Sequence, residues 1–227
     1  MKQRLEEIRR RMVSAANGCG RDPQSIRLVA VSKTVDAQRV AAAIDAGVTI
    51  LGENYIQEAR DKFNQLYDRK VQWHFIGHLQ SNKAKYAVRI FDLIHSVDSL
   101  KLARELDKAA EKLEKRQKIL LQVNISREAT KSGTTENEAI DLVRQISRFD
   151  HLQLQGLMTM PPFFDAPERA RPYFRALKQL RDRIAACNIE GIEMRELSMG
   201  MTGDFEVAIE EGATLVRIGT AIFGARR

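Results

Sequence analysis

The segment RLVAVSKTVDA, residues 27–37, carries the pattern that decides the fold. Residues 28–31 form a continuous apolar run, which is typical of a strand buried on both faces of a parallel sheet. The run is followed by Lys33, and an apolar pattern with helical spacing soon begins at Val40 and Ala43. A buried strand that leads directly into a helix predicts one β–α unit.

The same unit recurs along the chain. Eight strand candidates lie at 26–32, 49–55, 71–79, 92–97, 118–125, 152–160, 195–200 and 215–224, and helical patterns such as 102–113 and 173–184 lie between them. This alternation predicts an α/β protein with one (β/α)8 TIM barrel, a single domain over 1–227. An open doubly wound sheet is the alternative, but no G-x-G-x-x-G motif follows the first strand.

The N-terminal segment is predicted to add one helix to the barrel. Leu5, Ile8 and Met12 recur at helical spacing in a basic stretch that lacks the apolar core of a secretion signal. No apolar run approaches the roughly 20 residues needed to cross a bilayer, so we expect no membrane partner. Cys19 and Cys187 form no disulfide framework, which favours reduced thiols and a cytoplasmic location.

The net charge of +7 would suit an anionic partner. The basic residues are nevertheless interspersed with acidic ones, and no nucleic-acid-binding module is present, so we expect a solvated surface and no nucleic acid partner. An anionic small ligand remains compatible with this charge. No metal site is expected, because His74 and His78 would lie about 13 Å apart on a strand.

Polar residues gather where the predicted strands end. In a barrel the chemistry is found at the carboxyl ends of the strands. The residues there are Lys33, Asn54, His78, Ser96, Asn124, Met158, Thr159, Ser198, Arg217, Gly219 and Thr220. Any one of them could be an ordinary loop or capping residue, but together they favour a binding site.

Lys33 is the candidate nucleophile. A lysine at the end of a barrel strand is partly desolvated, which lowers its pKa and favours the neutral amine. Neutral lysine forms Schiff bases with carbonyl compounds. The alternative is a side chain that extends along the surface into solvent.

The last two strands carry candidate anion-binding groups. Barrels commonly bind phosphate there, and Ser198 and Thr220 could donate hydroxyl bonds while Gly200 and Gly219 allow a close backbone approach. Ordinary tight turns are the alternative. Arg217 should point to the same face as Gly219, and its buried guanidinium needs a partner. That partner is either an internal carboxylate or a ligand atom.

These features resemble a known family. The segments AVSKT, GENYIQE, HFIGHLQSNK, IHSVDS, QVNI, GLMTM, LSMGMTGDFEVAIEEGAT and VRIGTAIFG lie between residues 28 and 224. In combination they resemble the pyridoxal phosphate homeostasis protein family, whose fold is similar to the N-terminal barrel of alanine racemase.

The resemblance implies a specific cofactor and site. Pyridoxal 5'-phosphate would be bound covalently as an aldimine to Lys33, Arg217 would face the pyridine nitrogen, and no residue would be catalytic. The cofactor-binding set is Lys33, Asn54, Met158, Ser198, Gly200, Thr202, Arg217, Gly219 and Thr220. Asn54 and Met158 would line the ring pocket, and Ser198, Gly219 and Thr220 would hold the phosphate. Thr202 replaces the serine expected in SMGMS but retains the hydroxyl.

The expected function is binding rather than catalysis. An arginine at the pyridine nitrogen disfavours its protonation and weakens the cofactor as an electron sink. The sequence ends at Arg227, so we also expect no second domain to supply an opposing base. We therefore expect a monomeric carrier acting in vitamin B6 and amino-acid homeostasis, with apoenzymes as possible recipients. A racemase or decarboxylase is the alternative, and a cofactor-free aldolase acting on a phosphorylated sugar is a third possibility.

Overall fold

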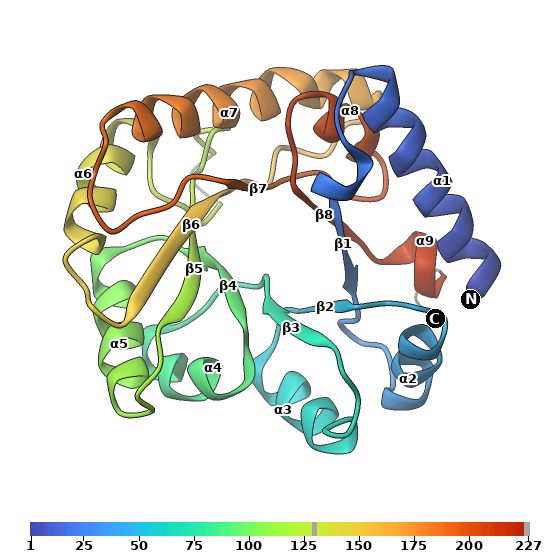
Figure 1. Ribbon diagram of the computed structural model, residues 1–227, viewed down its shortest axis with the longest axis horizontal. Helices are drawn as coiled ribbons and strands as arrows, with labels where there is room; N and C mark the ends of the chain where they lie inside the picture. The colour runs from blue at the N-terminus through green and yellow to red at the C-terminus, as the bar shows by residue number, and fades with distance from the viewer. Residues whose placement is uncertain (129–130, 225–227) are drawn as a thin grey trace.

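A computed structural model describes residues 1–128 and 131–224 and shows a closed barrel of parallel strands in chain order (Figure 1). The strands are β1 (Arg27–Val31), β2 (Ile50–Glu53), β3 (Gln72–Phe75), β4 (Leu93–Val97), β5 (Gln117–Gln122), β6 (Leu152–Met158), β7 (Glu196–Ser198) and β8 (Leu215–Ile218). Pairing of Arg27 with Leu215 and of Ala30 with Ile218 joins β1 to β8 and closes the sheet. The (β/α)8 prediction is confirmed. The prediction of a single domain over 1–227 includes residues 129–130 and 225–227, which lie outside the described ones.

Helices surround the barrel (Figure 1). They are α1 (Lys2–Gly18), α2 (Ala37–Asp45), α3 (Ile56–Gln65), α4 (Ala84–Ile90), α5 (Leu100–Glu111), α6 (Glu136–Ile146), α7 (Arg171–Ala186), α8 (Phe205–Glu210) and α9 (Thr220–Phe223). Across the described part of the chain, no helix has both the length and the apolar character of a membrane span.

The N-terminal helix is confirmed, and its apolar stripe explains where it lies. Leu5, Ile8 and Met12 are buried as expected. The helix packs beside α8 (Figure 1). Arg11 Nε donates a hydrogen bond of 2.6 Å to Glu206 Oε1. The apolar stripe of α1 therefore packs on the outside of the barrel, next to α8 and α9.

The last predicted strand was too long. The sequence predicts a strand over 215–224, whereas β8 ends at Ile218 and α9 begins at Thr220. A short apolar run does not distinguish strand from helix by periodicity. Gly219 stands between them with φ −116° and ψ −73°, so the strand conformation ends there.

Apolar residues form two layers, one between sheet and helices and one inside the barrel. The inner cluster contains Val29, Ile50, Leu93, Leu120, Met158 and Leu215, each from a different strand. All six are at most 3% exposed. A barrel interior of this kind is a packed core rather than a pore, so any site must lie at the rim.

Strands β6 and β7 approach one another very closely at Gly156. A Cβ atom built on Gly156 would lie 1.9 Å from the carbonyl oxygen of Glu196. The clash would be with backbone, which cannot move aside as a flexible side chain can. The absence of a side chain at Gly156 is therefore required for this strand pair.

Replacing this glycine should weaken the whole fold. Gly156→Ala should reduce the free energy of unfolding by roughly 1–3 kcal/mol, as expected for overpacking. The measurement is denaturant unfolding followed through the fluorescence of Trp73, which is 3% exposed. Gly18→Ala is the control, because a Cβ added there would meet nothing within 4 Å and should leave the midpoint nearly unchanged. Equal stability of the two variants would contradict the proposed close approach.

Candidate functional site

The site centres on a rim cavity of about 730 Å³ between the ends of β1 and β8, called here the Lys33 pocket. Its lining residues are Arg4, Val31, Lys33, Thr34, Val35, Arg39, Gly219, Thr220, Phe223 and Gly224. Three of these described residues are basic and none is acidic. The lining therefore favours an anionic ligand.

Arg4 and Arg39, the two arginines of the lining, both contact backbone carbonyl oxygens of α9. Arg39 donates to the carbonyl oxygen of Phe223, and Arg4 Nη1 lies 3.5 Å from the carbonyl oxygen of Ile222. Because both acceptors are neutral carbonyls, the arginine charges are not neutralised by these contacts. They remain as positive charge at the pocket wall.

Two predicted hydroxyls meet at the edge of this pocket. Thr220 Oγ1 lies 3.3 Å from Thr202 Oγ1, so the loops that follow β7 and β8 present their hydroxyls together. Gly219 lies against β1, where an added Cβ would come 3.3 Å from the carbonyl oxygen of Val31. Thr202, Gly219 and Thr220 thus form one polar edge.

Gly200 has a structural explanation. Its φ is +88°, a backbone conformation that residues other than glycine rarely adopt. An added Cβ would lie 2.5 Å from the Cβ of Ala208, because α8 packs directly on this turn. The glycine is therefore required by the β7–α8 connection whether or not an anion lies nearby.

A buried ionic group, called here the Lys62 cluster, holds the backbone on both sides of Lys33. Lys62 Nζ donates to the carbonyl oxygen of Ser32 at 2.5 Å, to Glu53 Oε1 at 2.8 Å and to Glu58 Oε1 at 2.6 Å. Ser32 Oγ also donates to Glu53 Oε1 at 2.6 Å. The Glu53 side chain is fully buried, and burial raises its pKa, although Lys62 opposes the shift.

The same cluster holds the residue after Lys33. The Thr34 amide donates to Glu58 Oε1 at 2.5 Å. Thr34 has φ +62°, a strained value for a β-branched residue. Fixing both neighbours leaves Lys33 half-buried at the rim with little backbone freedom.

A chain of buried polar side chains runs through the barrel interior. Arg217 donates from Nη1 to Ser198 Oγ at 2.6 Å and from Nη2 to the carbonyl oxygen of Thr159 at 2.9 Å. His95 Nδ1 lies 2.8 Å from Ser198 Oγ, and His95 Nε2 lies 3.0 Å from His74 Nδ1. Strands β3, β4, β7 and β8 each contribute one of the linked side chains.

Arg217 can only donate, so Ser198 Oγ accepts from it. The contacts of His95 with Ser198 and with His74 each join one donor to one acceptor, in the direction that the imidazole tautomers set. Burial lowers the pKa of His74 to about 3 and that of His95 well below its usual value, so both imidazoles are neutral near pH 7.

Burial lowers the pKa of Arg217 as well, but only to about 10, while nearby Asp204 opposes the shift. The guanidinium therefore stays charged near pH 7. The Ser198 hydroxyl and the Thr159 carbonyl oxygen are neutral, so they accept hydrogen bonds from the guanidinium without neutralising its charge. The interior consequently presents a fixed cation close to the rim.

The structure places two predicted ligand residues beneath the rim. Met158 and Ser198 are both 0% exposed, Met158 in the inner apolar cluster and Ser198 in the polar chain. The Ser198 hydroxyl contacts His95 Nδ1 and accepts from Arg217. Neither side chain presents surface to a ligand in this structure.

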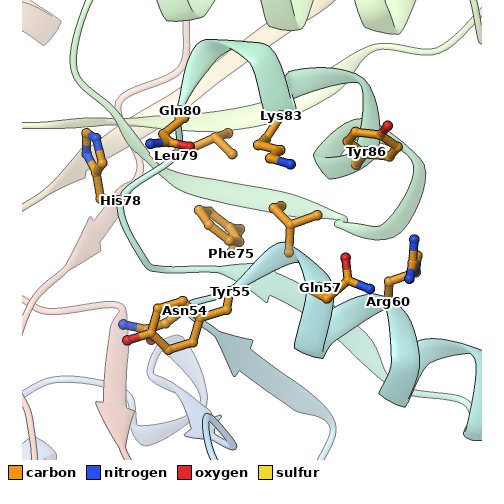
Figure 2. A pocket seen from close by; sticks show the side chains of 11 residues that line it. Asn54, Tyr55, Gln57, Arg60, Phe75, His78, Leu79, Gln80, Lys83 and Tyr86 are labelled. Carbon is orange, nitrogen blue, oxygen red and sulfur yellow. The ribbon is translucent and has the colours of Figure 1, made fainter.

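Asn54 lies at the rim but borders a neighbouring pocket between β2 and β3 (Figure 2). Its Oδ1 is buried without a hydrogen-bond partner among the described residues. The backbone there is tightly held, because a Cβ on Gly77 would lie 2.2 Å from the Asn54 carbonyl oxygen. An unpaired buried acceptor at the rim is suited to a ligand donor.

Sequence reasoning missed two parts of this site. His95 is not among the predicted site residues, although it contacts His74 and Ser198 from other strands. No local signal shows this, because Ser198 is 103 residues away. The Lys62 cluster has a visible signal, the i, i+4 pair of Glu58 and Lys62 on one helix face.

The sequence pattern of the alanine racemase N-terminal domain family matches residues 4–227. Curated relatives include the pyridoxal phosphate homeostasis proteins of Aquifex aeolicus and Escherichia coli. The first is 41% identical over 225 residues, covering 99% of this chain and 98% of the relative. The second is 41% identical over 226 residues, covering 98% and 95%.

Solved structures of PipY from Synechococcus elongatus are similar throughout. One without PLP is 35% identical, with a TM-score of 0.89, and covers 99% of this chain and 100% of PipY. One with PLP bound is 34% identical, with a TM-score of 0.86, and covers 98% and 99%. An alanine racemase from Clostridium difficile shares the fold at 15% identity and a TM-score of 0.70, and the match covers 96% of this chain but only 56% of that protein.

Breaking the Lys62 cluster should strongly destabilise the protein. Lys62→Met leaves the Glu53 carboxyl buried without its cation, so unfolding free energy should fall by about 3 kcal/mol or more. Lys62→Met combined with Glu53→Leu should recover much of that loss. Lys108→Met is the control, because Lys108 pairs with Glu105 at the exposed surface and its loss should change stability by less than about 1 kcal/mol. Equal denaturant midpoints for Lys62→Met and Lys108→Met would show that the cluster contributes no stability.

Proposed function

The chain belongs to the pyridoxal phosphate homeostasis protein family, and from this premise we propose that it binds pyridoxal 5'-phosphate in the Lys33 pocket, covalently through Lys33. It acts as a non-catalytic binding protein in intracellular pyridoxal phosphate and amino-acid homeostasis. Support comes from its full-length similarity to proteins of that name and to PipY, whose structure with PLP bound is 34% identical.

One observation carries this proposal. Lys33 lines the same cavity as Gly219 and Thr220, and the described lining contains basic but no acidic residues. An aldehyde that also bears a phosphate needs an amine and an anion-binding edge within one pocket. The Lys33 pocket offers both, at adjoining strands of the closed sheet.

The side chains present fit the cofactor. Thr202 and Thr220 can donate hydroxyl bonds to phosphate, and Arg4 and Arg39 add positive charge nearby. The Arg217 guanidinium offers only donors, so the ring nitrogen that it faces must be an acceptor and hence unprotonated. Asn54 and Met158 would border the ring, and Gly200 shapes the turn behind the phosphate edge.

The same residues argue against efficient catalysis. When bound, pyridoxal phosphate can serve as an electron sink for carbanions, most effectively with a protonated ring. Arg217 is a permanent cation held by Ser198 and Thr159, and it cannot donate a full proton near pH 7 because burial lowers its pKa only to about 10. Lys33 can move a proton on just one face of a bound substrate. We assign no catalytic residue.

We also propose how and where the protein acts on its cofactor. A reversible covalent bond at a half-buried rim lysine is suited to storing the cofactor and passing it to apoenzymes. The protein would do so as a monomer in the cytoplasm. A racemase or decarboxylase activity is the competing function, and the distant fold similarity to such enzymes supports only the shared barrel.

Removing Lys33 should abolish covalent attachment. After incubation with pyridoxal phosphate and borohydride, mass analysis should find the adduct on the Lys33 peptide and none in Lys33→Ala. Lys83→Ala is the control, because Lys83 lies in the neighbouring pocket. This variant should retain both the adduct on Lys33 and the visible absorbance. An adduct that persists in Lys33→Ala on another lysine would refute the attachment site.

Sustained turnover should be absent. Amino acids such as alanine or serine should shift the absorbance of the loaded protein without racemisation, transamination or decarboxylation beyond about one event per site. Loss of general acid–base assistance alone typically costs about 10²–10⁴ in rate. The assay compares stoichiometric with catalytic protein concentrations. Many turnovers that vanish in Lys33→Ala would instead establish the enzyme function.

A further inference from the structure

A second cavity of about 660 Å³ lies beside the Lys33 pocket, beyond the ends of β2 and β3, and is called here the Tyr86 pocket. Figure 2 shows Tyr55, Gln57 and Arg60 on one side, with Lys83 and Tyr86 on the opposite side. Phe75 lies between the two sides. The described linings of the two pockets have no residue in common. Asn54, which we propose to border the cofactor ring, lies on the side of this second pocket that adjoins the first.

The Tyr86 pocket carries positive charge that the protein scarcely neutralises. Arg60 and Lys83 line it, and no described lining residue is acidic. Arg60 meets Asp61 at 3.4 Å, with both side chains about half exposed, so this pair contributes little. Lys83 forms no ion pair within the described parts of the chain, and its ammonium lies 5.7 Å from the ring centre of Tyr86. Figure 2 shows these two cationic side chains on opposite sides of the pocket.

Aromatic rings supply the remainder of the surface. Tyr55 is 60% exposed at the start of α3, an unusual amount for a large ring that has no part in the core. Phe75 is 1% exposed and is held by Phe91, with ring centres 5.1 Å apart, so the side of the pocket that it forms is rigid. Such surfaces favour a flat ligand, because rings stack face to face or edge to face.

We propose that the Tyr86 pocket binds a small oxyanion carried on a flat ring, an aryl phosphate or an aryl carboxylate. The ring packs against Tyr55 and Tyr86, with the buried Phe75 beneath it, and the oxyanion lies between Arg60 and Lys83. The cavity volume is within the range usual for small-molecule sites, about 300–1,000 Å³. Gln57 and Gln80 offer amide donors and acceptors at the edges.

The test is calorimetric titration of the intact protein with phenyl phosphate and with benzoate. At least one should bind, and Arg60→Gln and Lys83→Gln should each raise its Kd at least about fivefold, as expected for loss of a charged hydrogen bond. Benzamide, which has the ring without the charge, and inorganic phosphate, which has the charge without the ring, should each bind at least about fivefold more weakly.

Lys85→Gln is the matched control. Lys85 lies 5.0 Å from the same Tyr86 ring but does not line the pocket, so its loss should leave the Kd unchanged. Thr220→Val should also leave it unchanged, because Thr220 belongs to the Lys33 pocket. Thermal unfolding of every variant confirms that it is folded.

Three results would overturn the proposal. The first is failure of both aryl anions to bind the folded wild-type protein at millimolar concentration. The second is equal weakening by Lys85→Gln and Lys83→Gln, which would indicate unspecific charge attraction. The third is loss of binding in Thr220→Val, which would place the anion in the Lys33 pocket.

Discussion

Pairing of β1 with β8 is the contact on which the candidate site depends. Residues 27–30 of β1 lie in register with residues 215–218 of β8, although nearly the whole chain separates them. This register brings Lys33 to the same cavity as Gly219 and Thr220. An open sheet of the same strands would leave the amine and the polar edge far apart, so closure of the barrel creates the binding pocket.

The rim uses two lysines in opposite ways. Lys62 is almost completely buried and satisfied by Glu53, Glu58 and a carbonyl oxygen, so it fixes backbone. Lys33 is half-buried in a pocket whose described lining contains no acidic residue. A buried ion pair adds little net stability, because desolvation offsets attraction, but it strongly disfavours other arrangements of the same loop. The Lys62 cluster therefore determines where the Lys33 amine is presented.

Inside the barrel, neutral histidines hold a charged arginine. His95 and His74 are kept uncharged by burial, and through Ser198 they orient Arg217 without adding charge. Protonation of either ring would place a second cation beside the guanidinium. The interior thus holds a fixed positive charge on Arg217, with Asp204 as the nearby opposing charge.

The sequence by itself determined the alternation of apolar strands and amphipathic helices, and hence the barrel and the rim position of Lys33, because strand and helix periodicities are local. It also placed Gly219 and Thr220 at the end of the last strand, whereas the contact of Thr202 with Thr220 came from the structure. It could not show that His95 contacts Ser198, or that Met158 and Ser198 lie beneath the rim. It also predicted a last strand that continued past Gly219, where the structure begins a helix. Those features depend on register and burial between distant strands, which only the closed tertiary structure decides.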